Sequence, residues 1–476
     1  MEASEFLVGG KRCRSGNVRR VINPFSSAVV GEVYQAGSRD IAAAIQAAAA
    51  GFEKTRQLQS YQRADILSCI SREIESNKEK FARLITAETG KPITFSRAEV
   101  DRSVFTFLYA SEEAKRLEGT VLPLDLAVHA SNRFGIVQRF PLGVVGAITP
   151  FNFPINLVAH KLAPAIAAGN SFVLKPSSNA PLTALTLGEI ISNSGYPTEA
   201  VNVVPCSGGE AEQLITDKRV KLVSFTGSPA VGWPLKIQAG AKKVVLELGG
   251  NAGVIVDKGT DIRSTAKRIA MGAYGNAGQS CIAVQRVYVH KELYRAFLDE
   301  FVDDSKATKV GDPNDEATVV GPMIDEAAAR KVEEWIGEAV ASGARVLCGG
   351  RRVGAVLEPT VLVDVRPDMK VSCQEVFAPV ATVDPFDSFQ QAVEMVNNSE
   401  YGLQAGVFTN DLSHLLYAYR QLDVGGVIIN DYPTFRIDHM PYGGVKGSGF
   451  GREGIKYAIE EMTEPKLLVI NAQLNP

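Results

Sequence analysis

Residues 143–175 read GVVGAITPFNFPINLVAHKLAPAIAAGNSFVLK, and this stretch indicates the fold. An apolar strand at VVGAITP precedes a helix from Ile155 to Ala168, which ends at Gly169-Asn170, and SFVLK begins a second apolar strand. A strand, a helix and a strand in immediate succession are typical of two parallel strands joined by a crossover helix. We therefore expect a parallel β-sheet with helices packed on its faces.

The alternation of strands and helices continues to residue 250. Apolar strands are predicted at AVNVVPC (200–206), KLVSFTGS (221–228) and KKVVLELGG (242–250), and Pro181 and Pro229 each open a helix between them. Together these strands predict an α/β fold with a Rossmann-like, doubly wound parallel sheet, in which ligands bind at the C-terminal ends of strands. A nucleotide is the first ligand to consider.

Further elements are predicted in the sequence before and after the segments that form this sheet. Helices are predicted over 41–55, 61–90 and about 97–117, and a β-ribbon is predicted over 121–139 with a turn near Ser131-Asn132. Strands and helices alternate again after residue 286, and 464–473 (EPKLLVINAQ) is predicted as a terminal strand. A chain of 476 residues is too long for one core, so two or more domains are expected.

Composition excludes several classes of function. The net charge of −3 gives no general attraction to nucleic acid or to an anionic membrane, so neither partner is expected. No apolar run reaches about 18 residues, which argues against a membrane span or a cleaved signal. The 6 cysteines are scattered without a CxxC pair or a histidine-rich companion, so neither a metal site nor a disulfide framework is expected. Unpaired cysteines favour a reducing, cytoplasmic setting.

Residues 272–286, GAYGNAGQSCIAVQR, surround the thiol of Cys281 with small residues that let a substrate approach the sulfur. Glu247 lies 34 residues upstream, at the end of an apolar strand and before Gly249-Gly250, where its carboxylate can face a site and act as a general base. The alternative is that Cys281 is a small buried residue and Glu247 a solvated strand end. Asn152, near a helix N-terminus, is equipped to stabilise an oxyanion or, alternatively, to cap the helix.

Two segments bear on a phosphate-containing cofactor. Gly227 and Ser228 precede the helix that begins at Pro229, so free amides there can receive a pyrophosphate, or Ser228 is an ordinary helix cap. The glycine fingerprint GxGxxG is missing, since Gly208-Gly209 is followed by Glu212 instead of a third glycine. The segment KPSS (175–178) carries no acid to bind a ribose 2′-hydroxyl, which leaves room for the 2′-phosphate of NADP.

These segments resemble the aldehyde dehydrogenase superfamily in the same order and across nearly the full chain. The matching motifs are ITPFNFP (148–154), KPSS (175–178), FTGS (225–228), LELGGN (246–251), NAGQSC (276–281), QEVFAPV (374–380) and PYGGVKGSGFGREG (441–454). The resemblance implies a nicotinamide-cofactor-binding domain at 1–120 and 140–246, a catalytic domain at 247–445, and bridging or oligomerisation segments at 121–139 and 446–476. It also implies a homodimer or homotetramer.

The resemblance assigns a role to each matching residue. Cys281 is similar to the family's nucleophile, Glu247 to its general base, and Asn152 with the Cys281 amide to its oxyanion hole. The thiolate attacks an aldehyde, hydride passes to NADP or NAD, and Glu247 activates the water that hydrolyses the thioester to a carboxylic acid. Positions that match the cofactor site are Ile148, Thr149, Pro150, Phe151, Lys175, Ser177, Ser178, Gly208, Phe225, Thr226, Gly227, Ser228, Leu248, Gly249, Glu375 and Phe377.

Two departures from the family pattern are the serine at Ser178 and the Glu212 that modifies the glycine-rich turn after the third strand, and the second leaves the pyrophosphate contacts open. Ser178 replaces a glutamate associated with NAD preference, which again favours NADP. Arg102 and Arg436 stand near the substrate tunnel of the family, and two guanidinium groups suit a small aldehyde with an anionic group, although arginine is more often exposed or ion-paired. His160 either lines the same tunnel or is a satisfied core residue.

The expected function is oxidation of a small polar or anionic aldehyde, such as a semialdehyde or a lactaldehyde-like or glyceraldehyde-like compound. Two alternatives from other classes remain. Cys281, Glu247 and Asn152 are also the equipment of a thiol hydrolase that needs no cofactor. A catalytically silent structural protein on the same scaffold is the other, although it would have no chemical need of Cys281 or Glu247.

Overall fold

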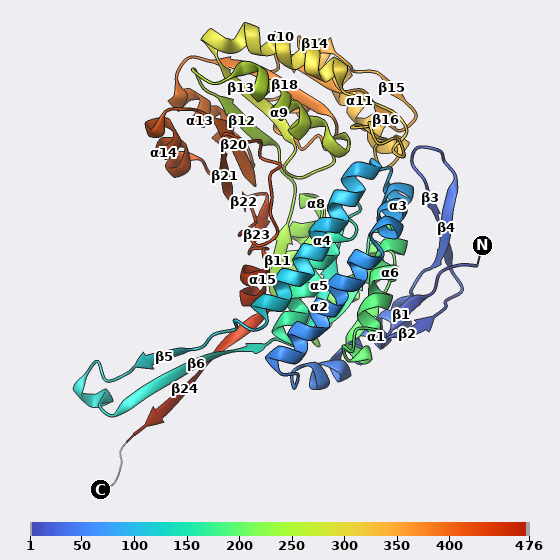
Figure 1. Ribbon diagram of the computed structural model, residues 1–476, viewed down its shortest axis with the longest axis vertical. Helices are drawn as coiled ribbons and strands as arrows, with labels where there is room; N and C mark the ends of the chain where they lie inside the picture. Colours follow the sequence, from blue (N-terminus) through green and yellow to red (C-terminus); the bar gives the residue numbers. More distant parts are fainter. Residues whose placement is uncertain (1, 473–476) are drawn as a thin grey trace.

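The computed structural model describes residues 2–472, so residue 473 of the predicted terminal strand and residues 473–476 of the predicted segment 446–476 lie outside the described residues. Figure 1 shows two α/β bodies stacked along the long axis of the molecule and a thin arm that projects from the lower body. The N-terminal half of the chain builds most of the lower body, and residues after about 250 build the upper one.

The first sheet, in the lower body, is the parallel sheet that the sequence predicts. Within residues 2–472 it has eight strands, of which β9, β8, β7, β10 and β11 run parallel and the outer ones antiparallel. Strand order reverses between β7 and β10, which creates a crevice at their C-terminal ends. In spatial order the strands are β2 (Lys11–Cys13), β1 (Phe6–Val8), β9 (Val201–Val203), β8 (Ser171–Lys175), β7 (Val144–Ile148), β10 (Val220–Thr226), β11 (Lys243–Glu247) and β23 (Gly449–Phe450).

Helices pack around the first sheet, and one of them is buried on every side. All residues of α5 are buried, because α5 contacts the strands β7 and β8 as well as the helices α2, α4 and α15. Figure 1 shows α2 and α4 in front of α5. The helices of this body are α1 (Ser38–Thr55), α2 (Ser60–Ser76), α3 (Lys78–Thr89), α4 (Ile93–Glu113), α5 (Asn156–Ala168), α6 (Pro181–Ser192), α7 (Gly208–Thr216), α8 (Pro229–Gln238) and α15 (Ile455–Glu461).

The second sheet, in the upper body, has seven strands in the described part of the chain, and only β14 runs antiparallel to its neighbour. In spatial order these are β14 (Arg345–Cys348), β17 (Thr360–Val363), β18 (Val380–Phe386), β13 (Val284–His290), β12 (Ala252–Val256), β20 (Gln404–Phe408) and β21 (Gly426–Ile429). Its helices are α9 (Ile262–Tyr274), α10 (Lys291–Ala307), α11 (Glu326–Ala341), α12 (Lys370–Cys373), α13 (Phe389–Asn397) and α14 (Leu412–Gln421).

The arm consists of β5 (Thr120–Pro123), β6 (Arg133–Pro141) and β24 (Thr463–Asn471). The strand β24 pairs antiparallel with β6 over its whole length, which ties the C-terminal segment to the predicted ribbon. Apolar side chains on the arm stay exposed, among them Val121, Leu126, Val128 and Leu468. Short two-stranded ribbons complete the fold, namely β3 (Val18–Ile22) with β4 (Val29–Tyr34), β15 (Arg352–Val353) with β16 (Val356–Leu357), and β19 (Tyr401–Gly402) with β22 (Val445–Lys446).

Several predicted element boundaries differ from the structure. The helix predicted over 61–90 is two helices, because the backbone of Asn77 (φ −106°, ψ 16°) leaves the helical region between α2 and α3. The helix predicted near 97–117 begins and ends four residues earlier, and α5 begins at Asn156. The predicted domain boundaries stay a prediction; within 446–476, β23 joins the first sheet, α15 packs on α5, and β24 joins the arm.

None of the helices within residues 2–472 is long and apolar enough to cross a membrane.

Candidate active site

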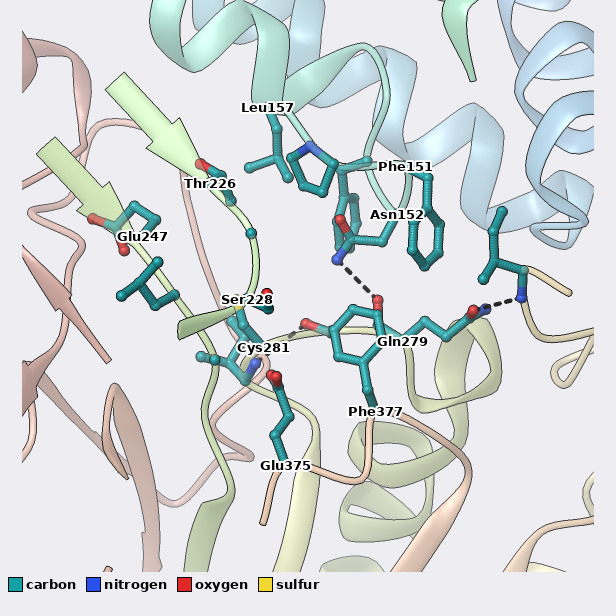
Figure 2. Close-up of a pocket in the computed structure, with 18 of the residues that line it drawn as sticks. Phe151, Asn152, Leu157, Thr226, Ser228, Glu247, Gln279, Cys281, Glu375 and Phe377 are labelled. Carbon is teal, nitrogen blue, oxygen red and sulfur yellow. Dashed lines mark hydrogen bonds between the residues drawn. The ribbon is translucent and has the colours of Figure 1, made fainter. Parts of the chain in front are cut away.

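A cavity of about 350 Å³ lies between the C-terminal ends of β7, β10 and β11 in the first sheet and the loops that precede β12 and β13 in the second. It therefore opens at the strand-order reversal of the first sheet, where α/β folds bind ligands. Figure 2 shows side chains from both bodies turned toward this space. The residues that line it include Arg102, Pro150, Phe151, Asn152, Thr226, Gly227, Ser228, Glu247, Leu248, Gly249, Cys281, Glu375, Phe377, Arg436, Tyr442 and Glu453.

Cys281 reaches the cavity from a strained turn. The turn between α9 and β13 holds Asn276 and Ala277 at φ +55°, a left-handed backbone conformation that costs a non-glycine residue roughly 1–2 kcal/mol. Gly278, also left-handed, packs against the backbone of Ala378, where a side chain would collide. Strain of this kind persists only where the surrounding structure enforces it, and it concentrates at functional sites.

The surroundings of Cys281 keep its thiol protonated. Burial, together with the carboxyl groups of Glu375 and Glu247, raises the pKa of the thiol to about 12. A contact of 3.0 Å from Sγ to the hydroxyl of Tyr442 acts in the opposite direction. The nucleophilic form of a cysteine is the thiolate, so this sulfur needs a group that favours its ionisation.

Asn152 lies near Cys281 with its amide in the cavity wall, as Figure 2 shows. Its Nδ2 donates to the backbone carbonyl of Gln279 at 3.0 Å, while its Oδ1 has no hydrogen-bond partner among the described residues. Because an amide nitrogen carries two hydrogens, Nδ2 keeps one for a ligand. Within residues 2–472, the backbone amide of Cys281 also donates to no protein acceptor. Two donors are therefore available beside the sulfur.

Glu247 ends β11 and is only 2% exposed. Neither of its carboxyl oxygens has a hydrogen-bond partner in the described part of the chain. Burial raises its pKa well above that of an ordinary carboxyl group, and the charge of Glu453 raises it further. Burial also opposes ionisation of Glu453, yet Lys161 and Arg436 lower the pKa of Glu453 to about 2. The pKa values of the two carboxyl groups are therefore shifted in opposite directions, upward for Glu247 and downward for Glu453, whose carboxylate binds the cations.

Arg436 is held by contacts that leave one of its nitrogens free. Its Nη2 donates to Glu453 at 3.1 Å and lies 3.4 Å from Nδ1 of His160, and its guanidinium stacks on the ring of Tyr442. The side chain is only 6% exposed, but Nε finds no acceptor among the residues that the structure describes. A buried guanidinium N–H without a partner, at the wall of a cavity, is a donor for a ligand.

The side chains of Arg102 and His160 both contact the carboxylate of Asp438. Arg102 binds the carboxylate through Nη2 at 2.6 Å and Nε at 3.3 Å, and His160 contacts it through Nε2 at 2.8 Å. Arg102 still lines the cavity, whereas His160 is buried and is not part of the cavity wall within residues 2–472. The structure brings Arg102 and Arg436 to the predicted site and puts His160 behind them.

Part of the predicted cofactor site fits a dinucleotide. The hydroxyl of Thr226 is buried without a partner in the described residues, and α8 begins just beyond it with Ser228 as its N-cap. The prediction of a free amide at Gly227 is wrong, because this amide donates to the backbone carbonyl of Glu247 at 3.0 Å. Free amides at a helix N-terminus bind phosphate. Across the cavity, Glu375 accepts from the Gly250 amide at 3.0 Å, and Phe377 packs edge-on against Phe151. Pro150, Leu248 and Gly249 complete this side of the wall.

The remaining predicted cofactor residues lie outside this cavity wall, as far as the described chain shows. Lys175 ends β8, and Ser178 lines a neighbouring cavity of about 690 Å³ together with Arg19 and Asn179. Gly208 is exposed at the start of α7. The others are Ile148, Thr149, Ser177 and Phe225, of which Ser177 accepts from the Asn179 amide at 3.2 Å.

Among the residues of the cavity wall that sequence reasoning missed are Tyr442, which contacts the thiol, and Glu453, which binds Arg436. Tyr442 and Glu453 both lie in the glycine-rich motif at 441–454. This motif was interpreted only through its glycines, so its polar side chains were not considered as site residues. Gly454 does need its freedom, since its φ is +93° and a side chain would meet the carbonyl of Met440. The signal that would have found Tyr442 and Glu453 is a polar group at each end of this motif. No cluster of potential metal ligands occurs within residues 2–472.

Comparisons with known proteins agree with this geometry. The model of the aldehyde dehydrogenase family matches residues 12–468. The chain is 44% identical to 3-sulfolactaldehyde dehydrogenase of Priestia megaterium over 98% of this chain and 97% of that one. It is 39% identical to lactaldehyde dehydrogenase of Methanococcus aeolicus over 95% and 97%.

Solved structures are equally similar. Aldehyde dehydrogenase 21 from Physcomitrella patens, in complex with the reaction product succinate, superposes with a TM-score of 0.97 at 43% identity and covers 99% of both chains. The glyceraldehyde-3-phosphate dehydrogenase of Methanocaldococcus jannaschii, complexed with NADP, has a TM-score of 0.92 at 38% identity and covers 96% of this chain and 100% of its own.

The chain belongs to the aldehyde dehydrogenase family and has its fold. It is therefore an oxidoreductase, an NAD(P)-dependent aldehyde dehydrogenase. The prediction of the family from its motifs is confirmed, and the comparisons give no support to a cofactor-independent hydrolase.

Proposed function

We propose that this chain oxidises a small aldehyde that carries an anionic group, with Cys281 as nucleophile and Glu247 as general base. The observation that carries the proposal is the buried guanidinium of Arg436, a residue that lines the cavity with the thiol and whose Nε has no hydrogen-bond partner within the described residues. The names of relatives point the same way, since sulfolactaldehyde and succinate both carry an anion.

The charges around Arg436 support an anionic substrate. Lys161, Arg436 and Arg102 contribute three positive charges, and Glu453 and Asp438 contribute two negative ones. Burial and the nearby Arg436 lower the pKa of His160, and burial with Glu453 raises the pKa of Glu247, so both shifts favour the neutral forms of these groups. One positive charge is therefore uncompensated at a partly desolvated site. A carboxylate or sulfonate on the substrate would balance it.

The proposed reaction uses the residues in sequence. The Cys281 thiolate attacks the aldehyde carbon, and the resulting oxyanion accepts hydrogen bonds from Nδ2 of Asn152 and the Cys281 amide. The acceptor for the hydride that leaves the aldehyde carbon would be supplied by a nicotinamide cofactor when it is bound. Glu247, as carboxylate, then takes a proton from the water that attacks the thioester, which releases the carboxylic acid and the thiol. Thr226 and Ser228 would hold the cofactor's phosphates, and Glu375 its nicotinamide ribose.

The proposed anion site is tested with aldehydes matched in length. We expect kcat/KM for succinic semialdehyde to exceed kcat/KM for butanal by at least about tenfold. In the Arg436→Lys variant, kcat/KM for succinic semialdehyde should fall roughly ten- to hundredfold, while kcat/KM for butanal should not change. Lysine keeps the charge but loses the guanidinium fork. The matched control is Arg420→Lys, at an exposed position on α14. Equal losses for both aldehydes would place Arg436 in the fold or the chemistry instead of in anion binding.

We also propose that the cofactor is NADP in preference to NAD. Lys175 ends β8, the hydroxyls of Ser177 and Ser178 follow it, and Arg19 lines the same second cavity as Ser178. We expect the Ser178→Glu variant to raise KM for NADP by about tenfold or more with little change for NAD, because a carboxylate repels the 2′-phosphate. Ser413→Glu, on the upper body, is the control. Unchanged KM values in steady-state assays would refute this contact.

The exposed apolar arm supports a homodimer or homotetramer. Val121 is 67% exposed, Leu126 85% and Val128 94%, and such surface needs cover in solution. Light scattering of the purified protein is expected to give a mass of two or four chains. A stable monomer at micromolar concentration would contradict this proposal.

A cytoplasmic location is proposed because all of the cysteines are free. Recovery of the chain in a membrane or extracellular fraction would contradict it.

A further inference from the structure

The hydroxyl of Tyr442 lies 3.0 Å from the sulfur of Cys281. Tyr442 is only 3% exposed, and among the described side chains its hydroxyl is the hydrogen-bonding partner of Sγ. Figure 2 draws this contact as a dashed line beside Cys281. The chemistry outlined above assigns a task to Cys281, Glu247 and Asn152 but none to this phenol.

The position of Tyr442 is fixed by its backbone and its ring. Its amide donates to the carbonyl of Glu453 at 3.0 Å, and the Glu453 amide donates back at 2.7 Å. The guanidinium of Arg436 lies 3.6 Å from the centre of the tyrosine ring, and the Glu453 carboxylate holds that guanidinium. The phenol is therefore preorganised against the sulfur and has little freedom to lose when it forms a hydrogen bond.

The charged groups around the sulfur determine the direction of this hydrogen bond. Glu247 on β11 and Glu375 in the loop before β18 disfavour a thiolate, and Arg436 favours it. Burial and the neighbouring Cys281 raise the pKa of the Tyr442 phenol well above its usual value, so the phenol keeps its proton. A thiolate has no hydrogen, so the bond between these groups must run from the phenol to the sulfur.

We propose that Tyr442 is a further catalytic residue, whose hydroxyl donates a hydrogen bond to the Cys281 thiolate and stabilises the nucleophile before it bonds to the aldehyde. This inference rests on the proposed role of Cys281. The cation stacked on the ring strengthens the donor, because it withdraws electron density from the phenol. Once sulfur is bonded to carbon it is only a weak acceptor, so Tyr442 acts where the sulfur carries negative charge, in the attacking thiolate and again when the thiolate leaves during hydrolysis.

The first test is alkylation of Cys281 by iodoacetamide in protein without cofactor or aldehyde. A hydrogen bond to a charged group is worth about one pKa unit or more, so Tyr442→Phe reduces the thiolate population roughly tenfold. The more basic thiolate is intrinsically more reactive, which recovers part of that loss. We expect the alkylation rate at a fixed pH to fall about three- to tenfold. Phenylalanine preserves the ring and its stacking on Arg436, so a role in packing alone predicts no change.

A second variant at position 442 should raise the alkylation rate of Cys281 instead of lowering it. Difluorotyrosine at position 442, with the fluorines flanking the hydroxyl, makes the phenol more acidic and a stronger donor. We expect faster alkylation than in the wild type at the same pH. Tyr196→Phe is the matched control, because it also removes a buried hydroxyl, one that donates to the carbonyl of Asn170 in the lower body. Peptide mapping restricts the measured rate to Cys281.

The outcomes separate this inference from the proposed function. Equal alkylation rates in the wild type and Tyr442→Phe, or rates that do not rise with the fluorinated phenol, would overturn the role of Tyr442 even if anionic aldehydes are oxidised. A rate that falls with Tyr442→Phe and rises with difluorotyrosine supports the hydrogen bond even if no tested aldehyde is a substrate. Should Tyr442→Phe fold poorly, the fluorinated variant alone decides.

Discussion

The Cys281→Ala variant is expected to lose aldehyde-dependent reduction of NADP by roughly ten-thousandfold or more, because the covalent route through the thioester is then closed. Cofactor binding should be retained, since the substitution leaves Thr226 and the α8 N-terminus, the proposed phosphate site, unchanged. The measurement is the near-ultraviolet absorbance of the reduced nicotinamide with succinic semialdehyde in excess.

Cys206 provides the matched control for this variant. Burial raises the pKa of its thiol to about 12, as it does for Cys281, yet Cys206 lies in the core of the lower body. Cys206→Ala should therefore retain activity. Substantial turnover by Cys281→Ala would exclude the thiol as nucleophile, and loss of activity in both variants would indicate damage to the fold.

The Glu247→Gln variant should separate oxidation from hydrolysis. Glutamine has the shape of glutamate but cannot accept a proton from water, so steady-state turnover should fall by about 10²–10⁴. The first turnover should persist as a burst of reduced cofactor that approaches one equivalent per chain. Stopped-flow absorbance measures both phases, and a variant that loses the burst to the same extent as the steady state would assign Glu247 to an earlier step.

The raised pKa of Glu247 also predicts a pH dependence. Only the carboxylate accepts the proton, and burial together with Glu453 moves its ionisation to higher pH than for an ordinary carboxyl group. Hydrolysis in the wild type should therefore increase as the pH rises through that shifted value. In Glu247→Gln this limb of the pH profile should disappear. A profile that is unchanged by the substitution would mean that a different group titrates.

The parallel sheet, and the placement of Asn152 and Cys281 in one site, could be predicted from the sequence because both follow from local patterns. Apolar runs that end in glycine or proline define the strands, and the residues just beyond strand ends meet at one edge. Asn152, Thr226 and Glu247 follow or end such strands, and all of them line the cavity.

Pairings between distant residues were not accessible from the sequence. Arg102 and Asp438 are 336 positions apart, and nothing local indicates that Asp438 neutralises Arg102 or that His160 shares the same carboxylate. The contact of Tyr442 with Cys281 spans 161 positions and depends on how the glycine-rich motif folds against the upper body. The break at Asn77 was missed for another reason, since asparagine also occurs within helices and only the tertiary packing decides.

The most direct test of the account is the mass of Glu247→Gln after it is mixed with NADP and succinic semialdehyde. Acid quenching followed by intact-protein and peptide mass spectrometry should find one acyl group per chain, on the peptide that contains Cys281, and only when NADP is present. No adduct on this peptide, or an adduct that forms without reduction of the cofactor, would contradict oxidation through a Cys281 thioester.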